Sequence, residues 1–144
     1  MPDALSVESV RRLVQEWYDA LDRHDPLDAV LPYLADNGLT MQFPEATLRT
    51  ADDFGGWYDT VTHRFFDEIH EVKRVDVELL SPLHADVSVL VNWQARVWNP
   101  PAATSEWLGF DASQTWSVVL QDGQPRIRSY AVDDLAPMPG SAEL

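Results

Sequence analysis

The order of the hydrophobic repeats along the chain is the feature that most limits its fold. Apolar side chains first recur at helical spacing from Val7 to Leu21 and from Phe54 to Phe65, which predicts two amphipathic helices. Later they alternate with polar residues, which predicts strands. The alternating segments are 75–79, 87–97, 108–120 and 126–134. Helices followed by consecutive antiparallel strands predict an α+β fold whose helices cover one face of the sheet.

The ends of these elements carry local signals. Ser6 is suited to cap the helix that includes Val7, and Thr50 is suited to cap the helix that includes Phe54, which is the third in chain order. Both side chains can accept a hydrogen bond from a free backbone N–H. Asp25-Pro26 predicts the start of a short second helix. Met41 to Phe43 reads as a short edge strand, and Asp122-Gly123 as a hairpin turn.

Length and composition narrow the class of protein. The 144 residues suit one domain, 1–144, with an ordered core of about 6–136 and a flexible tail, 137–144, rich in Pro, Gly and Ser. A net charge of −14 argues against a nucleic-acid partner and against an anionic membrane surface. Cysteine is absent, which excludes thiol chemistry and fits a cytoplasmic protein.

Four stretches together resemble the nuclear-transport-factor-two-like superfamily, and within it the SnoaL-like (polyketide cyclase-like) domain. They read EWYDALDRHD, LRTADDFGGWYDTV, VNWQARVWNP and QDGQPRIRSYAVDDL, and the order of elements matches over residues 6–136. The resemblance implies a cone-shaped, curved antiparallel sheet wrapped by three N-terminal helices, with a ligand cavity between them. Members include cyclases, isomerases, dehydratases and epoxide hydrolases, as well as proteins without catalytic activity, so the fold alone does not give the function.

Asp133 and His70 are the candidate catalytic residues. Asp133 lies where the resemblance places a closing aspartate, and a carboxylate on a cavity wall can act as a general base. The alternative for Asp133 is a solvated strand end or an ion pair with Arg128. His70 lies where the third helix gives way to a strand, and an inward-facing histidine there could form an acid/base pair with a carboxylate.

A metal site is an alternative interpretation of the same region. If the third helix continued, then His63, Asp67 and His70 would share one stripe and imitate a two-histidine, one-carboxylate site. That stripe lies opposite the apolar face of the helix and would face water. We therefore predict no metal and no cofactor. His24 reads as a turn residue.

Aromatic side chains are numerous, with six tryptophans among them. Rings of this kind suit a pocket for a hydrophobic or aromatic small molecule, although they also fill cores. The predicted pocket residues are Tyr18, Phe43, Trp57, Trp93, Phe110, Gln114, Trp116 and Tyr130. The first function hypothesis is a cofactor-independent isomerase, cyclase or dehydratase that uses acid/base chemistry in this pocket.

The second hypothesis is a non-catalytic ligand-binding or accessory dimerisation protein. Alternation places Asn92, Gln94, Arg96 and Trp98 on one face of a strand and its valines on the other. The valine face is expected to pack on the helices. The opposite face is then predicted to form a homodimer through the sheet, because interface cores favour Trp and Arg.

Overall fold

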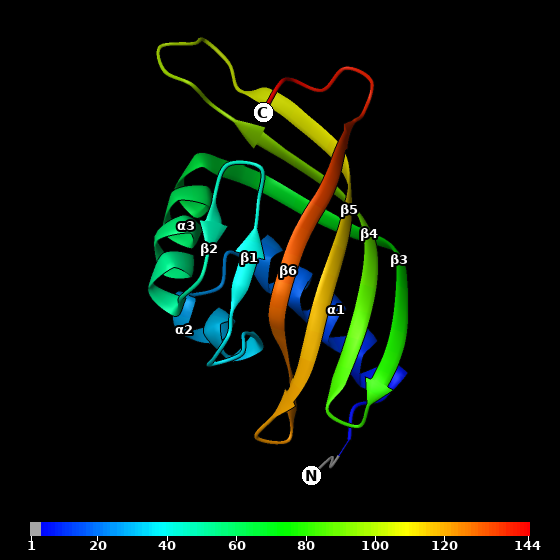
Figure 1. The fold of residues 1–144 in the computed structure, drawn as a ribbon. Coiled ribbons are helices and arrows are strands. Elements are labelled where there is room, and N and C mark those ends of the chain that lie inside the picture. The colour runs from blue at the N-terminus through cyan, green and yellow to red at the C-terminus, as the bar shows by residue number, and fades with distance from the viewer. Residues whose placement is uncertain (1–3) are drawn as a thin grey trace.

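The computed structural model describes residues 4–144 and confirms the α+β fold (Figure 1). Its helices are α1 (Val7–Asp22), α2 (Leu27–Val30), the 3-10 helix η1 (Leu31–Tyr33) and α3 (Ala51–Arg64). Its strands are β1 (Thr40–Gln42), β2 (Thr47–Leu48), β3 (Phe65–Ser81), β4 (His84–Val97), β5 (Glu106–Gln121) and β6 (Gln124–Pro137). The strands of this region form one curved sheet in the order β2-β1-β6-β5-β4-β3. The predicted sheet is antiparallel, but β1 runs parallel to β6, so the sheet is mixed.

Helix α1 lies across one face of the sheet, which we call the inner face (Figure 1). The Ser6 side chain accepts a hydrogen bond from the Ser9 N–H at 3.0 Å, and Ser9 Oγ accepts one from the Ser6 N–H at 3.0 Å. This capping box satisfies two free donors at the start of the helix and confirms the predicted cap. Val10, Val14 and Trp17 are fully buried against the sheet, as the helical spacing predicts. The burial of this apolar stripe therefore fixes the orientation of α1, including its C-terminal end, on the inner face of the sheet.

Strand β3 begins at Phe65, well before the predicted start at residue 75. Phe65, Ile69 and Val72 recur at spacings of four and three, which imitates a helix and hides the strand from a search for alternation. The helix nevertheless ends at Arg64, and β3 pairs with β4 along its whole length. His63 and His70 therefore lie on different elements, and the helical metal stripe weighed for His63, Asp67 and His70 does not form.

The valine face of β4 packs on the inner side, as predicted, because Val87, Val89 and Val91 belong to the main core. The opposite face is polar, and some of its side chains form hydrogen bonds within the chain. The Asn92 amide donates to Asp111 Oδ1 at 2.9 Å, and Arg96 Nε donates to Ser105 Oγ at 2.7 Å. Whether this face also binds a second copy of the chain stays a prediction.

The C-terminal residues continue along the edge of β5 beyond the end of β6. The Met138 N–H donates to the Gly109 carbonyl at 2.9 Å, and the Ala142 N–H donates to the Trp107 carbonyl at 2.9 Å. These bonds tie residues 138 and 142 to β5, and Leu144 lies at the wall of the cavity described below. The flexibility of the tail 137–144 stays a prediction. Among residues 4–144, no helix is both long enough and apolar enough to cross a membrane.

Candidate active site

A cavity of about 640 Å³ lies between the inner face of the sheet, α3 and the C-terminal end of α1. Much of its lining is apolar or aromatic: Leu21, Phe43, Trp57, Val61, Phe65, Val91, Trp93, Tyr130, Val132 and Leu135. The histidine and carboxylate side chains that reach it are His24, Glu45, Glu68 and His70. A volume of this size suits a small organic molecule, and a few polar groups in an apolar wall would fix its orientation.

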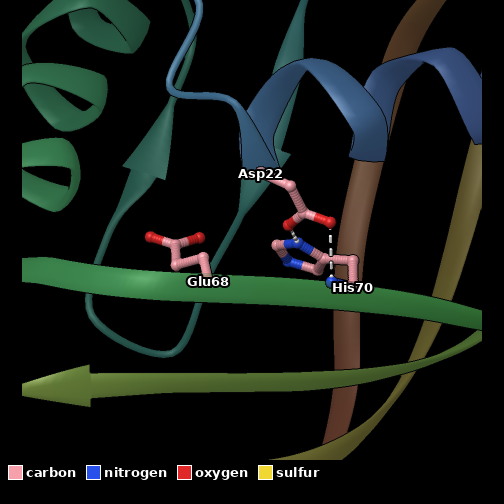
Figure 2. Close-up of side chains that lie close together, drawn as sticks. All are labelled: Asp22, Glu68 and His70. Atoms are coloured by element: carbon pink, nitrogen blue, oxygen red, sulfur yellow. Dashed lines mark hydrogen bonds and ion pairs between the residues drawn. The ribbon is translucent and has the colours of Figure 1, made fainter.

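Asp22 and His70 form a close pair (Figure 2), of which His70 lines the cavity. Asp22 Oδ1 lies 2.6 Å from His70 Nδ1, and Asp22 Oδ2 accepts the His70 backbone N–H at 2.8 Å. Their side chains are 22% and 10% exposed, respectively. A carboxylate can only accept here, so Nδ1 carries a proton, and in the neutral form of the imidazole Nε2 keeps its lone pair. This arrangement is that of an oriented general base.

Two aromatic rings fix the plane of the imidazole. The Tyr18 ring stacks on His70 with 4.7 Å between ring centroids, and the Trp93 ring lies 6.5 Å away at a similar tilt. Tyr18 comes one turn before Asp22 on α1, so the same helix face supplies both the acceptor and the stacking ring. The His70 ring is therefore positioned by residues of α1 and β4 as well as by its own strand, β3.

A β-bulge turns His70 and Glu68 toward the cavity. Phe66 pairs with Arg96 and Ile69 with Gln94, so two residues of β3 face one of β4. Within the bulge Asp67 has a φ of 53°, a left-handed conformation that aspartate tolerates better than most residues. The extra residue shifts the alternation by one, and this shift re-aims the side chains that follow.

Glu68 is the second carboxyl group of the site. Its side chain is only 9% exposed, and one carboxyl oxygen lies 3.2 Å from His24 Nε2. Burial raises the pKa of Glu68 above its ordinary value, although the charge of His70 and hydrogen bonding from His24 and Trp93 oppose the rise. Glu68 is therefore held in its acid form to higher pH than an exposed glutamate would be.

A neutral polar cluster forms part of the cavity wall at Gln114 and Tyr130 and extends behind it to Tyr18 and Trp116. Gln114 Oε1 accepts from the Tyr18 hydroxyl at 2.6 Å and from the Trp116 indole N–H at 3.0 Å. The indole N–H can only donate, so it fixes which end of the Gln114 amide faces it. Burial raises the pKa of Tyr18 and Tyr130, so both phenols stay protonated and the cluster carries no charge.

The structure brings most of the predicted pocket residues together. Phe43, Trp57, Trp93, Gln114 and Tyr130 line the cavity. The other three lie behind the wall, where they position the groups that do line it. Tyr18 stacks on His70, Trp116 donates to Gln114, and the Phe110 ring packs on Trp93 with 6.1 Å between centroids.

Asp133 does not reach the cavity, and its predicted placement there is corrected. It is exposed and accepts a hydrogen bond from the Thr115 hydroxyl at 2.6 Å, on the outer face of the sheet. A register shift explains this placement: Ser113 pairs with Asp134 and Gln114 with Val132, so Asp133 is the extra residue of a bulge. Val132 and Leu135 take the cavity wall instead.

Asp22, His24 and Glu68 are the site residues that sequence reasoning missed. Asp22 could have been found from its position one turn after Tyr18, on the stripe that faces the sheet. Nothing in the local pattern of β3 reveals Glu68, because its orientation depends on the bulge at Asp67.

The three groups Asp22, Glu68 and His70 place ligand-type atoms within 4.8 Å of one another. Acidic and imidazole groups at this spacing also occur without an ion. Both Asp22 oxygens accept hydrogen bonds from His70, so the described contacts are those of a hydrogen-bonded pair.

Comparison with known proteins places this fold. No protein-family model and no curated protein matches the chain, but solved structures do. A candidate scytalone dehydratase from Novosphingobium aromaticivorans is 14% identical, with 94% of each chain covered and a TM-score of 0.76. A hexachlorocyclohexane dehydrochlorinase, LinA-type3, from Novosphingobium barchaimii is 13% identical over 95% of this chain and 92% of the other, with a TM-score of 0.75.

A ketosteroid isomerase-like protein from Erwinia carotovora is 16% identical over 92% of this chain and 95% of the other, with a TM-score of 0.69. The chain therefore has the nuclear-transport-factor-two-like fold, a cone-like α+β architecture. The SnoaL-like resemblance seen in the sequence is confirmed at the level of this superfamily fold. Identities this low show the fold and leave the activity to be argued from the site.

Proposed function

We propose that the protein is a cofactor-independent acid/base enzyme that removes a proton from a carbon atom of an apolar small molecule. The observation that carries the proposal is the Asp22–His70 pair, with 2.6 Å between Oδ1 and Nδ1, at the wall of an apolar cavity. A fixed imidazole with a free Nε2 needs no further activation to accept a proton.

The first step transfers the substrate proton to His70 Nε2. The electron pair of the broken C–H bond forms a carbon–carbon double bond, either by expelling a group from the neighbouring carbon or by shifting an existing double bond. Asp22 stabilises the imidazolium that results, because its carboxylate already accepts the Nδ1 proton. Oriented acid/base catalysis of this kind contributes roughly 10²–10⁴-fold in rate.

The cavity wall favours a flat or cyclic substrate. Phe43 and Trp57 stack with 4.2 Å between centroids on one side, and Trp93 lies on another. Such rings bind apolar ring systems well. The names of the structural neighbours are compatible with this chemistry, since a dehydratase and a dehydrochlorinase both remove a proton together with a leaving group.

The proposal is tested with three probes: hexachlorocyclohexane, 3-hydroxycyclohexanone and 3-chlorocyclohexanone. Elimination and carbon-bound hydrogen exchange are followed by NMR in deuterated buffer. We expect the wild-type protein to accelerate at least one of these reactions, and His70→Gln to lower that rate by roughly 10²–10⁴-fold. A His70→Gln protein that folds and retains the wild-type rate would refute the role of His70.

A further inference from the structure

The buried carboxyl group of Glu68 has no task in the proton removal proposed above, yet it lies on the same cavity wall. Glu68 and His70 are neighbours on the cavity side of β3, and Asp22 sits across from them at the end of α1 (Figure 2). Ligand-type atoms of the three residues fall within 4.8 Å of one another. The three side chains are therefore close enough for one small substrate to contact both His70 and Glu68.

We infer that Glu68 is the acid of this site, which donates a proton to the oxygen of a hydroxyl leaving group while His70 removes a proton from the neighbouring carbon. The inference rests on the proposed role of His70. It assigns the substrate class as alcohols that lose water, in which the hydroxyl group lies next to a carbon with a removable proton. Hydroxide is a poor leaving group, whereas water leaves readily, so this reaction needs an acid beside the base.

The surroundings of Glu68 suit a proton donor. Low exposure favours the uncharged form of the carboxyl group. The titratable groups that face it are His24 and Asp22 from the end of α1 and the turn after it, His70 from β3, and Tyr58 from α3. The Tyr58 hydroxyl donates to the Asp25 carbonyl at 2.6 Å, and the pKa of Tyr58 is raised to about 12, so it does not compete as the acid.

The step balances without any further reactant. The carbon proton moves to His70 Nε2, the C–H electron pair becomes the new double bond, and the C–O bond breaks with its electrons on oxygen. The Glu68 proton then completes a water molecule. The protein is left with a protonated His70 and an ionised Glu68. Release of the His70 proton to solvent and uptake of a proton by Glu68 restore the starting state.

The structure also explains why Glu68 can serve in this way although neighbouring acidic residues cannot. Asp67 precedes it in the bulge with its φ of 53°, and Glu71 follows His70 on the exposed side of β3. Of these three acidic residues of β3, only Glu68, the second residue of the bulge, lines the cavity, and its side chain is only 9% exposed. Glu71 is therefore a matched control, a glutamate on the same strand and outside the site.

The first experiment asks whether Glu68 holds a proton and requires no substrate. Infrared difference spectra of the wild type against Glu68→Gln are recorded across a pH titration, with Glu71→Gln as the control. We expect the carbonyl band of a protonated carboxylic acid to persist in the wild type after the exposed carboxylates have ionised. The band should be absent from Glu68→Gln and unchanged in Glu71→Gln. A wild-type band that disappears together with those of the exposed carboxylates would overturn the inference.

The second experiment separates the acid from the base by leaving group. For 3-hydroxycyclohexanone we expect Glu68→Gln to lower the elimination rate by roughly 10²-fold or more, with partial recovery in Glu68→Asp. For 3-chlorocyclohexanone, whose leaving group needs no proton, the loss should be at least tenfold smaller. Equal losses for both probes, or loss of activity on metal chelation with recovery on adding Zn²⁺, would contradict the acid role.

The two proposals fail in different ways. His70→Gln lowers both elimination rates if the proposed function holds, and leaves both at wild-type values if it does not. Glu68→Gln changes the ratio of the two rates only if Glu68 is the acid. A merely structural role of Glu68 would lower both rates together and would leave no acid band in the spectrum.

Discussion

Replacing Asp22 by Asn separates the charge of this residue from its shape, and it is the sharpest available test of the pair. Asn keeps one oxygen that can accept a hydrogen bond, but its other end becomes an NH₂ group. In the wild type both carboxylate oxygens accept from His70, at 2.6 and 2.8 Å. At least one of these contacts must therefore be lost or turned into a donor facing a donor.

The size of the effect can be worked from these contacts. A hydrogen bond to a charged group contributes about 1.5–3 kcal/mol net, and the side chains are 22% and 10% exposed, so water only partly replaces it. We expect Asp22→Asn to lower the free energy of unfolding by about 2 kcal/mol. Stability is measured by urea unfolding at neutral pH. Nitrogen NMR of the imidazole should also report loss of the Nδ1–H tautomer at His70.

Asp59 and His63 provide the matched control on the surface of α3. Their side chains are 77% and 78% exposed, and Asp59 Oδ1 lies 3.4 Å from His63 Nδ1. Exposed pairs of this kind contribute at most about 1 kcal/mol, and many contribute nothing measurable. Asp59→Asn should therefore be close to neutral. If Asp22→Asn were equally neutral and left the His70 tautomer unchanged, then the reasoning behind the pair would be wrong.

Three further predictions concern the groups around the pair. The raised pKa of Glu68 means that the folded state binds its proton more tightly than the unfolded state. Wild-type stability should therefore fall relative to Glu68→Gln as the pH rises from the ordinary glutamate pKa through the folded one, and parallel curves in urea unfolding would contradict this. Gln114→Leu leaves the Tyr18 hydroxyl and the Trp116 N–H without their acceptor. It should lower the free energy of unfolding in urea by about 2–4 kcal/mol, and a loss below about 1 kcal/mol would be inconsistent with the cluster. Asp67→Gly should be tolerated in thermal unfolding, whereas Asp67→Val should cost about 1–3 kcal/mol, because a β-branched residue resists a φ of 53°; equal melting temperatures would count against strain at the bulge.

The fold follows from the sequence wherever one periodicity runs without interruption. The stripe that includes Val10, Val14 and Trp17 gives α1, and the alternation through Val87, Val89 and Val91 gives the inner face of β4. The same alternation predicts that Trp93 and Gln114 face inward, and both line the cavity. Regular elements and their buried faces are thus accessible to pattern reasoning, because each residue's direction depends only on its place in the repeat.

The polar part of the site was harder to predict because it lies where the repeats fail. One bulge turns Glu68 and His70 inward on β3, and another turns Asp133 outward on β6. A shift of one residue reverses the direction of every side chain that follows it. The sequence thus predicts His70 as a site residue but assigns it the wrong carboxylate. The bulge on β6 turns Asp133 to the outer face, whereas the end of α1 directs Asp22 toward His70.

The two bulges also indicate why the site has its present composition. An uninterrupted β3 that kept Phe65 inward would direct Asp67 and Ile69 to the cavity and His70 to the solvent. The bulge exchanges this arrangement for one that presents a shielded carboxyl group and an imidazole two residues apart, with Asp22 opposite. Bulges lie frequently beside active sites, where the extra residue re-aims side chains and bends the strand locally. The left-handed conformation of Asp67 is the local backbone cost of that exchange.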